Sequence, residues 1–111
     1  MWQEYFEQVD VFLMPTCFTV AFQHDHKGDL LTRTIHTPDG ICPYMQLMPW
    51  VVTATLTGCP ATAAPIGQSS SGLPVGIQIM GPFWEDATSI EFAALLSDEI
   101  GGFTAPPGYG A

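Results

Sequence analysis

Basic residues are nearly absent from this sequence. Its 111 residues include 2 Lys or Arg against 11 Asp or Glu, which gives a net charge of −9. Nucleic-acid binding requires clustered Lys and Arg that neutralise phosphates, and anionic membrane surfaces attract the same residues. Lys27 and Arg33 alone supply no such cluster. We therefore expect neither nucleic acid nor a membrane surface as a partner.

Charges of either sign are also scarce. Charged residues make up 12% of the chain and hydrophobic residues 47%, whereas a typical soluble domain is about 25% charged. No Asp, Glu, Lys, Arg or His occurs in residues 40–84. A free surface needs scattered charges, and a domain of this size buries only about two-thirds of its unfolded surface. The sequence thus predicts a piece of a larger protein or an obligate oligomer.

Signatures of secreted and membrane-inserted chains are lacking too. The first residues have neither the basic region nor the apolar run of a signal peptide. Prolines interrupt the uncharged stretch at positions 43, 49, 60 and 65, which argues against a membrane span. Three scattered cysteines without a CxxC pair fit a reducing cytosol rather than a disulfide scaffold or a zinc site: Cys17, Cys42 and Cys59. We expect a cytoplasmic protein.

Hydrophobic periodicity predicts a small α/β arrangement that forms a single partial domain over residues 1–111. The expected order is a helix end over 2–8, a strand over 11–14, a loop over 15–42 with a short strand at 32–35, a helix over 45–57, strands over 61–66 and 75–80, and a helix from Glu85 or Asp86 to Gly101. The strand over 11–14 is expected to be buried on both faces, and that over 75–80 to be central. Apolar residues cover more than half of the last helix, which predicts cover on two sides. Residues 103–111 form an irregular Pro/Gly-rich tail.

Four segments resemble one enzyme family. They are DVFLMPT over residues 10–16, LTGCPA over 56–61 with APIG over 64–67, GLPVGIQIMGP over 72–82, and the pair GGF and PPGY near the end of the chain. In this order and spacing they resemble the C-terminal segment of the amidase-signature hydrolases. The resemblance covers nearly the whole chain.

This resemblance implies an α/β/α enzyme built on one mixed sheet. It also implies hydrolysis of a linear amide through a Ser–Ser–Lys triad, an acyl-enzyme intermediate, a small-molecule amide substrate, and no metal or organic cofactor. In the family the triad lies upstream of the segment that this chain matches. We therefore expect no catalytic residue here and no activity of the chain alone. We expect it to pair with the missing N-terminal part or with itself, and the alternative function is a non-catalytic, self-associating α/β module.

Two features imitate the absent triad. Residues 69–72, Ser-Ser-Ser-Gly, look like a nucleophile loop, but they follow one predicted strand and precede another, so we interpret them as a surface turn. Lys27 is the sole lysine, and it lies between His26 and Gly28 in a predicted loop. A solvated loop lysine is the better interpretation.

Three side chains are candidates for substrate contact, each with a plainer alternative. Gln78 is the one strongly polar residue of its predicted strand, and buried amides usually serve structure. Cys17 follows the Pro-Thr end of a strand, where α/β sheets place their sites, but a small buried thiol is the simpler interpretation. Trp50, with Tyr44 and Met48, lines either a pocket or plain core.

Two further hypotheses concern metal and substrate. His24, Asp25, His26 and His36 offer metal-ligand chemistry, but positions i and i+2 of an irregular loop do not fix a tetrahedral site, and we expect no metal. Amidotransferase members of the resembling family align a carboxylate with Met48. Its absence favours a plain amidase with a less polar substrate.

Overall fold

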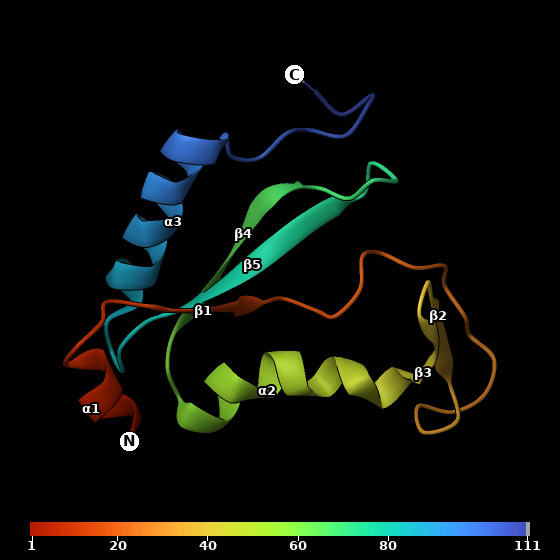
Figure 1. Cartoon of the computed structure of the whole chain (residues 1–111), viewed down its shortest axis with the longest axis horizontal. Coiled ribbons are helices and arrows are strands. Elements are labelled where there is room, and N and C mark those ends of the chain that lie inside the picture. The colour runs from red at the N-terminus through yellow and green to blue at the C-terminus, as the bar shows by residue number, and fades with distance from the viewer. Residues whose placement is uncertain (111) are drawn as a thin grey trace.

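The computed structural model describes residues 1–110 (Figure 1). Its elements, in chain order, are α1 (Trp2–Phe6), β1 (Phe12–Pro15), β2 (Thr34–Thr37), β3 (Gly40–Pro43), a 3₁₀ turn (Tyr44–Leu47), α2 (Met48–Thr57), β4 (Ala61–Gln68), β5 (Pro74–Met80) and α3 (Asp86–Ile100). The α/β class is confirmed. Residues 101–110 form no helix or strand, and Ala111, the end of the predicted tail, lies outside the described residues.

Two antiparallel sheets organise these elements. The larger has the order β1-β5-β4 and the smaller is the β2–β3 hairpin. Leu13 of β1 and Thr62 of β4 both pair with Ile79 of β5, so the strand over 74–80 is central as predicted. The expected mixed sheet is wrong for residues 1–110, where every strand pairing is antiparallel. The β2–β3 and β4–β5 pairs are consecutive strands that reverse direction, which gives antiparallel ladders, and β1 pairs antiparallel with β5 although β2, β3, α2 and β4 lie between them in the chain.

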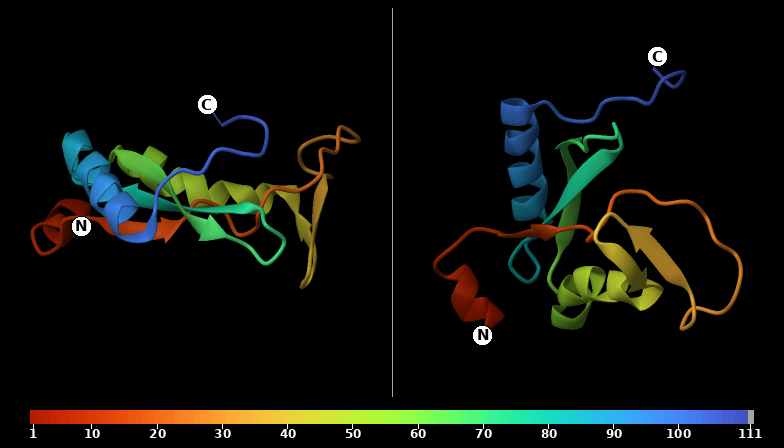
Figure 2. Two further views of the ribbon diagram at one scale, coloured as in Figure 1. Left: turned by 90° about the horizontal axis from the view of Figure 1, so that it is seen from above. Right: turned by 45° about the vertical axis from the view of Figure 1, so that its right-hand side comes forward.

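The two faces of β5 meet different helices. Thr62 pairs with Ile79, and its hydroxyl lies 2.9 Å from that of Ser89 in α3, so Ile79 faces α3. On the opposite face, Met80 joins a small core with α2 and the N-terminal segment: Ala54, Cys59, Trp2, Phe6 and Phe12. The views agree that α2 and α3 lie on different sides of the sheet (Figures 1 and 2).

This sheet is incompletely covered. The chain exposes 8192 Å², whereas a compact monomer of 12.0 kDa exposes about 6,000 Å². Its radius of gyration is 16.2 Å, against about 13 Å for a compact domain of similar length. The strand over 11–14 was expected to be buried on both faces, but Leu13 is 44% exposed. The last helix was expected to be covered on two sides, but Ile90 and Leu95 are 59% and 60% exposed. Residues 1–110 therefore cover only some of the apolar side chains that the sequence predicted to be buried.

The β2–β3 hairpin differs from the expected loop over 15–42. Its turn is Pro38-Asp39, followed by Gly40 at φ 133°, and Thr37 Oγ1 donates a hydrogen bond of 2.9 Å to the Gly40 carbonyl. The Pro-Asp-Gly sequence, with Ile35 and Ile41 on its two sides, is a turn signal that identifies such a hairpin. Figure 2 shows the hairpin at the far end of the molecule from α1.

Gly58 directly follows the predicted helix over 45–57 and ends α2 in the left-handed conformation, at φ 71°. An added Cβ here would lie 3.2 Å from Cε2 of Phe83. We therefore expect Gly58→Ala to lower the free energy of unfolding by about 1–2 kcal/mol from backbone strain alone, and by more because of Phe83. Gly72→Ala is the matched control, since Gly72 has φ 77° but nothing within 4 Å of an added Cβ. Urea unfolding of both variants measures the difference; equal losses would contradict a role for the Phe83 contact.

Candidate functional site

The structure brings together two of the three substrate-contact candidates. Gln78 Nε2 donates a hydrogen bond of 2.8 Å to the backbone carbonyl of Trp50, in the first turn of α2. A carbonyl only accepts, so the amide NH₂ must face it and Oε1 must face away. No hydrogen bond of Oε1 is present within residues 1–110. Gln78 thus ties the central strand to α2 and presents a fixed acceptor.

Cys17, the third candidate, lies apart from this pair. In the ladder, Met14 of β1 is opposite Gln78, and Cys17 is three residues further along the chain, a distance of roughly 10 Å at strand spacing. Its neighbour Thr16 donates from Oγ1 to the Gly76 carbonyl at 3.3 Å. Cys17 lines a hollow of about 330 Å³ with Thr16, Phe18 and Gly76. Its thiol is half-buried and unpaired among the described cysteines.

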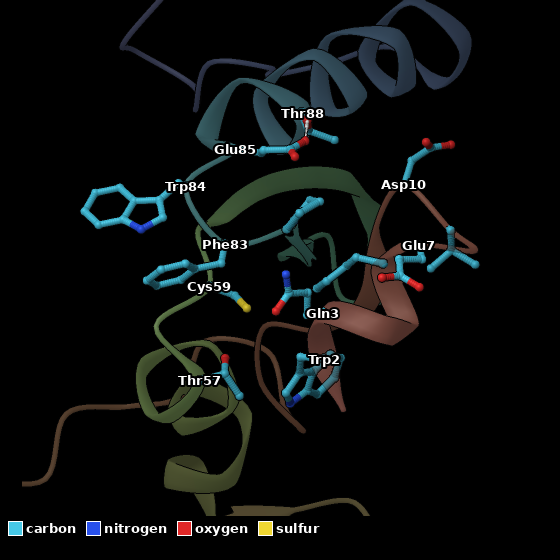
Figure 3. Close-up of a pocket in the computed structure, with 13 residues that line it drawn as sticks. Trp2, Gln3, Glu7, Asp10, Thr57, Cys59, Phe83, Trp84, Glu85 and Thr88 are labelled. Carbon is cyan, nitrogen blue, oxygen red and sulfur yellow. Dashed lines mark hydrogen bonds between the residues drawn. The ribbon is translucent and has the colours of Figure 1, made fainter.

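A second hollow lies at the other end of the sheet (Figure 3). It has a volume of about 710 Å³ and is built by α1, the end of α2 and the loop before α3. We call it the aromatic hollow; its walls are Trp2, Phe6, Phe83 and Trp84, its acidic residues Glu7, Asp10 and Glu85. Cys59 points into it, whereas Trp84 points outward (Figure 3). Sequence reasoning missed it because its walls come from distant segments.

Phe83 and Trp84 stand on the open side of the aromatic hollow. They are 57% and 83% exposed, and their ring centroids are 5.1 Å apart. Trp84 has φ 67°, the single positive φ among the non-glycine residues described. Exposed aromatic side chains are typical of contact surfaces rather than of free ones. This end of the sheet is therefore a candidate contact surface.

Two of the serines that imitate a triad are engaged within their own turn. Ser69 Oγ lies 2.8 Å from Ser71 Oγ and accepts the Leu73 N–H at 3.2 Å, so these serines close the β4–β5 turn as predicted. Lys27 is exposed, and its backbone N–H donates to Asp25 Oδ1 at 2.8 Å. No hydrogen bond joins Lys27 to the turn serines within the described part of the chain.

Residues 1–110 contain neither a cluster of metal ligands nor a helix that could span a membrane. The rings of His24 and His26 are 5.8 Å apart. Across residues 1–110, no three His, Cys, Asp or Glu side chains converge in a way that could hold a metal ion. Over the same residues, no helix is long and apolar enough to cross a bilayer.

Comparisons with known proteins agree on one family. The amidase family model matches residues 1–90. A glutamyl-tRNA(Gln) amidotransferase subunit of Maricaulis maris is 34% identical over 105 residues, which are 95% of this chain and 19% of the relative. Its counterpart in Rhodospirillum rubrum is 35% identical over 104 residues, or 94% and 19%. The fatty acid amide hydrolase of Medicago truncatula is 34% identical over 98 residues, or 88% and 15%.

The matches also show how much of each relative this chain covers. This chain spans less than a fifth of the length of the curated relatives that it matches. The matched region contains the turn serines, the Gln78–Trp50 contact and the aromatic hollow up to Thr88. The chain belongs to the amidase family.

Proposed function

We propose that this chain forms the C-terminal part of an amidase that hydrolyses a linear amide bond. The observation that carries the proposal is the match to the amidase family over residues 1–90. The chemistry we propose is acyl transfer through a Ser–Ser–Lys triad in another part of the domain. In support, Ser69 and Ser71 are hydrogen-bonded to each other, and within residues 1–110 no hydrogen bond joins the serines at 69–71 to Lys27.

The proposed contribution of this chain is structural support for a substrate site. β5 supplies a central strand, and Gln78 holds α2 against it through the Trp50 carbonyl. In the intact enzyme we place Gln78 Oε1, Trp50 and the hollow beside Cys17 along the wall that receives the substrate. A rigid scaffold of this kind positions reacting groups that other segments supply.

A neutral substrate is the second element of this proposal. Met48 begins α2 and is 37% exposed, at the position where the amidotransferase members of the family align a carboxylate. No charged residue occurs in residues 40–84. A site without a carboxylate has nothing to pair with a substrate ammonium group, so we propose a plain amide with little charge.

The purified 111-residue chain is expected to give no turnover of p-nitroanilide amides above buffer, because no serine hydroxyl is hydrogen-bonded to Lys27 or to a histidine within residues 1–110. Ser70→Ala and Lys27→Ala should leave this background unchanged. Release of p-nitroaniline, followed by absorbance, is the measurement. Robust turnover that Ser70→Ala abolishes would show that the β4–β5 turn is catalytic and would overturn the proposal.

The second candidate function is a self-associating, non-catalytic module. The observation that favours it is the exposed area of 8192 Å², well above the roughly 6,000 Å² of a compact monomer of this mass. A single symmetric oligomer would support the module. Assemblies of mixed mass, or a chain that completes its folding only with further amidase segments, would support the enzyme fragment.

A further inference from the structure

Basic side chains are confined to one region of this acidic chain. Every Lys, Arg and His lies between residues 24 and 36: His24, His26, Lys27, Arg33 and His36. In the structure this segment is the exposed loop before the hairpin together with β2. The segment also contains Asp25 and Asp29, so with neutral histidines its formal charge is zero, and the other residues carry the whole net charge of −9. An anion that approaches the molecule is therefore repelled least by this segment.

A single helical turn holds Arg33, the one arginine of the chain. The Arg33 N–H donates to the Asp29 carbonyl at 3.1 Å. Asp29 Oδ1 accepts the N–H groups of Leu31 and Thr32 at 2.8 and 2.9 Å, and the Thr32 hydroxyl at 3.2 Å. The hydrogen bonds from Thr32 and Leu31 hold the pKa of Asp29 below its ordinary value. The nearby positive charge of Arg33 also lowers the pKa of Asp29. No carboxylate of residues 1–110, that of Asp29 included, forms an ion pair with the Arg33 guanidinium within 4.0 Å.

The Arg33 guanidinium uses little of its hydrogen-bonding capacity. Its Cζ lies 5.3 Å from the centre of the Tyr44 ring, a cation–π contact that fixes the group beside the hairpin. Its one hydrogen bond within residues 1–110 runs from Nη2 to the Gly28 carbonyl at 3.5 Å, the outer limit for such a bond. Nε is buried and has no partner among these residues. A group with five donors is held in place yet almost unpaired.

A small hollow opens beside this guanidinium. Its volume is about 190 Å³, and Phe22, His24, His26, Arg33, Thr34 and Tyr44 line it. Phe22 and Tyr44 meet edge to face at 6.2 Å and form an apolar wall. Asp25 also lines the hollow, but its Oδ1 accepts the Lys27 N–H. Drug-sized ligands need about 300–1,000 Å³, so the space suits a small acid or the acidic end of a larger molecule.

We propose that this hollow is a carboxylate-binding site in which Arg33 pairs with the anion and the Phe22–Tyr44 wall contacts its apolar part. The planar fork of arginine matches a carboxylate in a way that a lysine ammonium does not. Thr34 and the two histidines add donors around the same space. The site does not depend on the proposed amidase activity, since all of its groups belong to residues 22–44.

Benzoate is the probe, and benzamide is its neutral counterpart of the same shape. Because the chain has one arginine, the Nε–H of Arg33 gives a single resonance in ¹H–¹⁵N spectra. We expect benzoate to shift this resonance saturably and benzamide to leave it in place. Arg33→Lys should weaken benzoate binding about tenfold or more, because it keeps the positive charge but loses the planar guanidinium fork. Binding to this variant is followed through the resonances of neighbouring backbone amides.

Lys27→Gln is the matched control for Arg33→Gln, since each removes one positive charge from the same loop, and Lys27 does not line this hollow. We expect Lys27→Gln to change affinity by no more than about twofold, as for a solvated charge, and Arg33→Gln to abolish saturation. Absence of a saturable shift overturns the proposal. Equal binding of benzamide or inorganic phosphate, or equal losses in the two glutamine variants, also overturns it. Should Arg33→Gln lose the dispersed spectrum of the folded chain, Arg33→Lys decides.

Discussion

Ile79→Ala is expected to abolish the cooperative unfolding transition of this chain. Ile79 is fully buried, at 0% exposure, in the middle of the three-stranded sheet, where Leu13 and Thr62 flank it. Truncation of a buried isoleucine to alanine lowers the free energy of unfolding by about 2–5 kcal/mol, because the burial of the side chain is lost and a cavity remains. The free energy of unfolding of small domains is about 5–15 kcal/mol. Because its described part has five buried hydrophobic residues, we expect this chain to lie at the lower end of that range.

Urea unfolding followed by far-ultraviolet circular dichroism measures this effect. The matched control is Ile66→Ala, since Ile66 belongs to the same sheet but is 40% exposed at the β4 irregularity. We expect the control to lose no more than about 1 kcal/mol, because much of its side chain already contacts water. Similar midpoints for the two variants would show that the centre of β5 does not carry the stability of the fold.

Self-association through the aromatic hollow is the second large effect that we expect. Phe83 and Trp84 expose a pair of adjacent rings, and one aromatic side chain can bury about 150–250 Å². The isolated chain is expected to elute as assemblies of mixed mass, all heavier than its 12.0 kDa monomer. Phe83→Ser with Trp84→Gly is expected to shift the mass toward that of the monomer.

Glycine at position 84 ensures that a loss of association is not caused by misfolding of the loop. Trp84 has φ 67°, a conformation that glycine adopts without strain, so the change should not destabilise the loop before α3. The control removes two other exposed side chains, Leu31→Ser in the turn before β2 and Leu56→Ser in α2, which are 77% and 82% exposed. Light scattering after size exclusion gives the masses. If both double variants keep the mass of the original chain, or if that chain is already a monomer, the aromatic hollow is not the association surface.

Local patterns in the sequence were enough for the positions of most elements. The apolar alternation of residues 75–80 predicted the central strand, and Gly58 and Gly101 marked the ends of two helices. These features depend on neighbours within a few residues, through backbone conformation and side-chain period. The segments over 10–16, 56–67 and 72–82 identified the family for the same reason, since they are contiguous in the chain.

Burial and the hollows depended on contacts that no local pattern contains. Whether Leu13 is covered depends on which segments lie over β1, and residues 1–110 leave it 44% exposed. The pairing of Gln78 with the Trp50 carbonyl joins residues 28 positions apart. The antiparallel direction of every described strand pair likewise followed from how the connections turn in space.

Composition and short-range order thus determined what this protein is: an acidic, charge-poor segment of the amidase family with a central strand between helices. Only the tertiary structure decided where its side chains meet: Arg33 over Tyr44, Gln78 on Trp50, and the aromatic hollow between α1 and the loop before α3. The reason is physical. Secondary structure follows from the backbone and near neighbours, whereas a site forms where distant segments pack, and packing is a property of the whole arrangement.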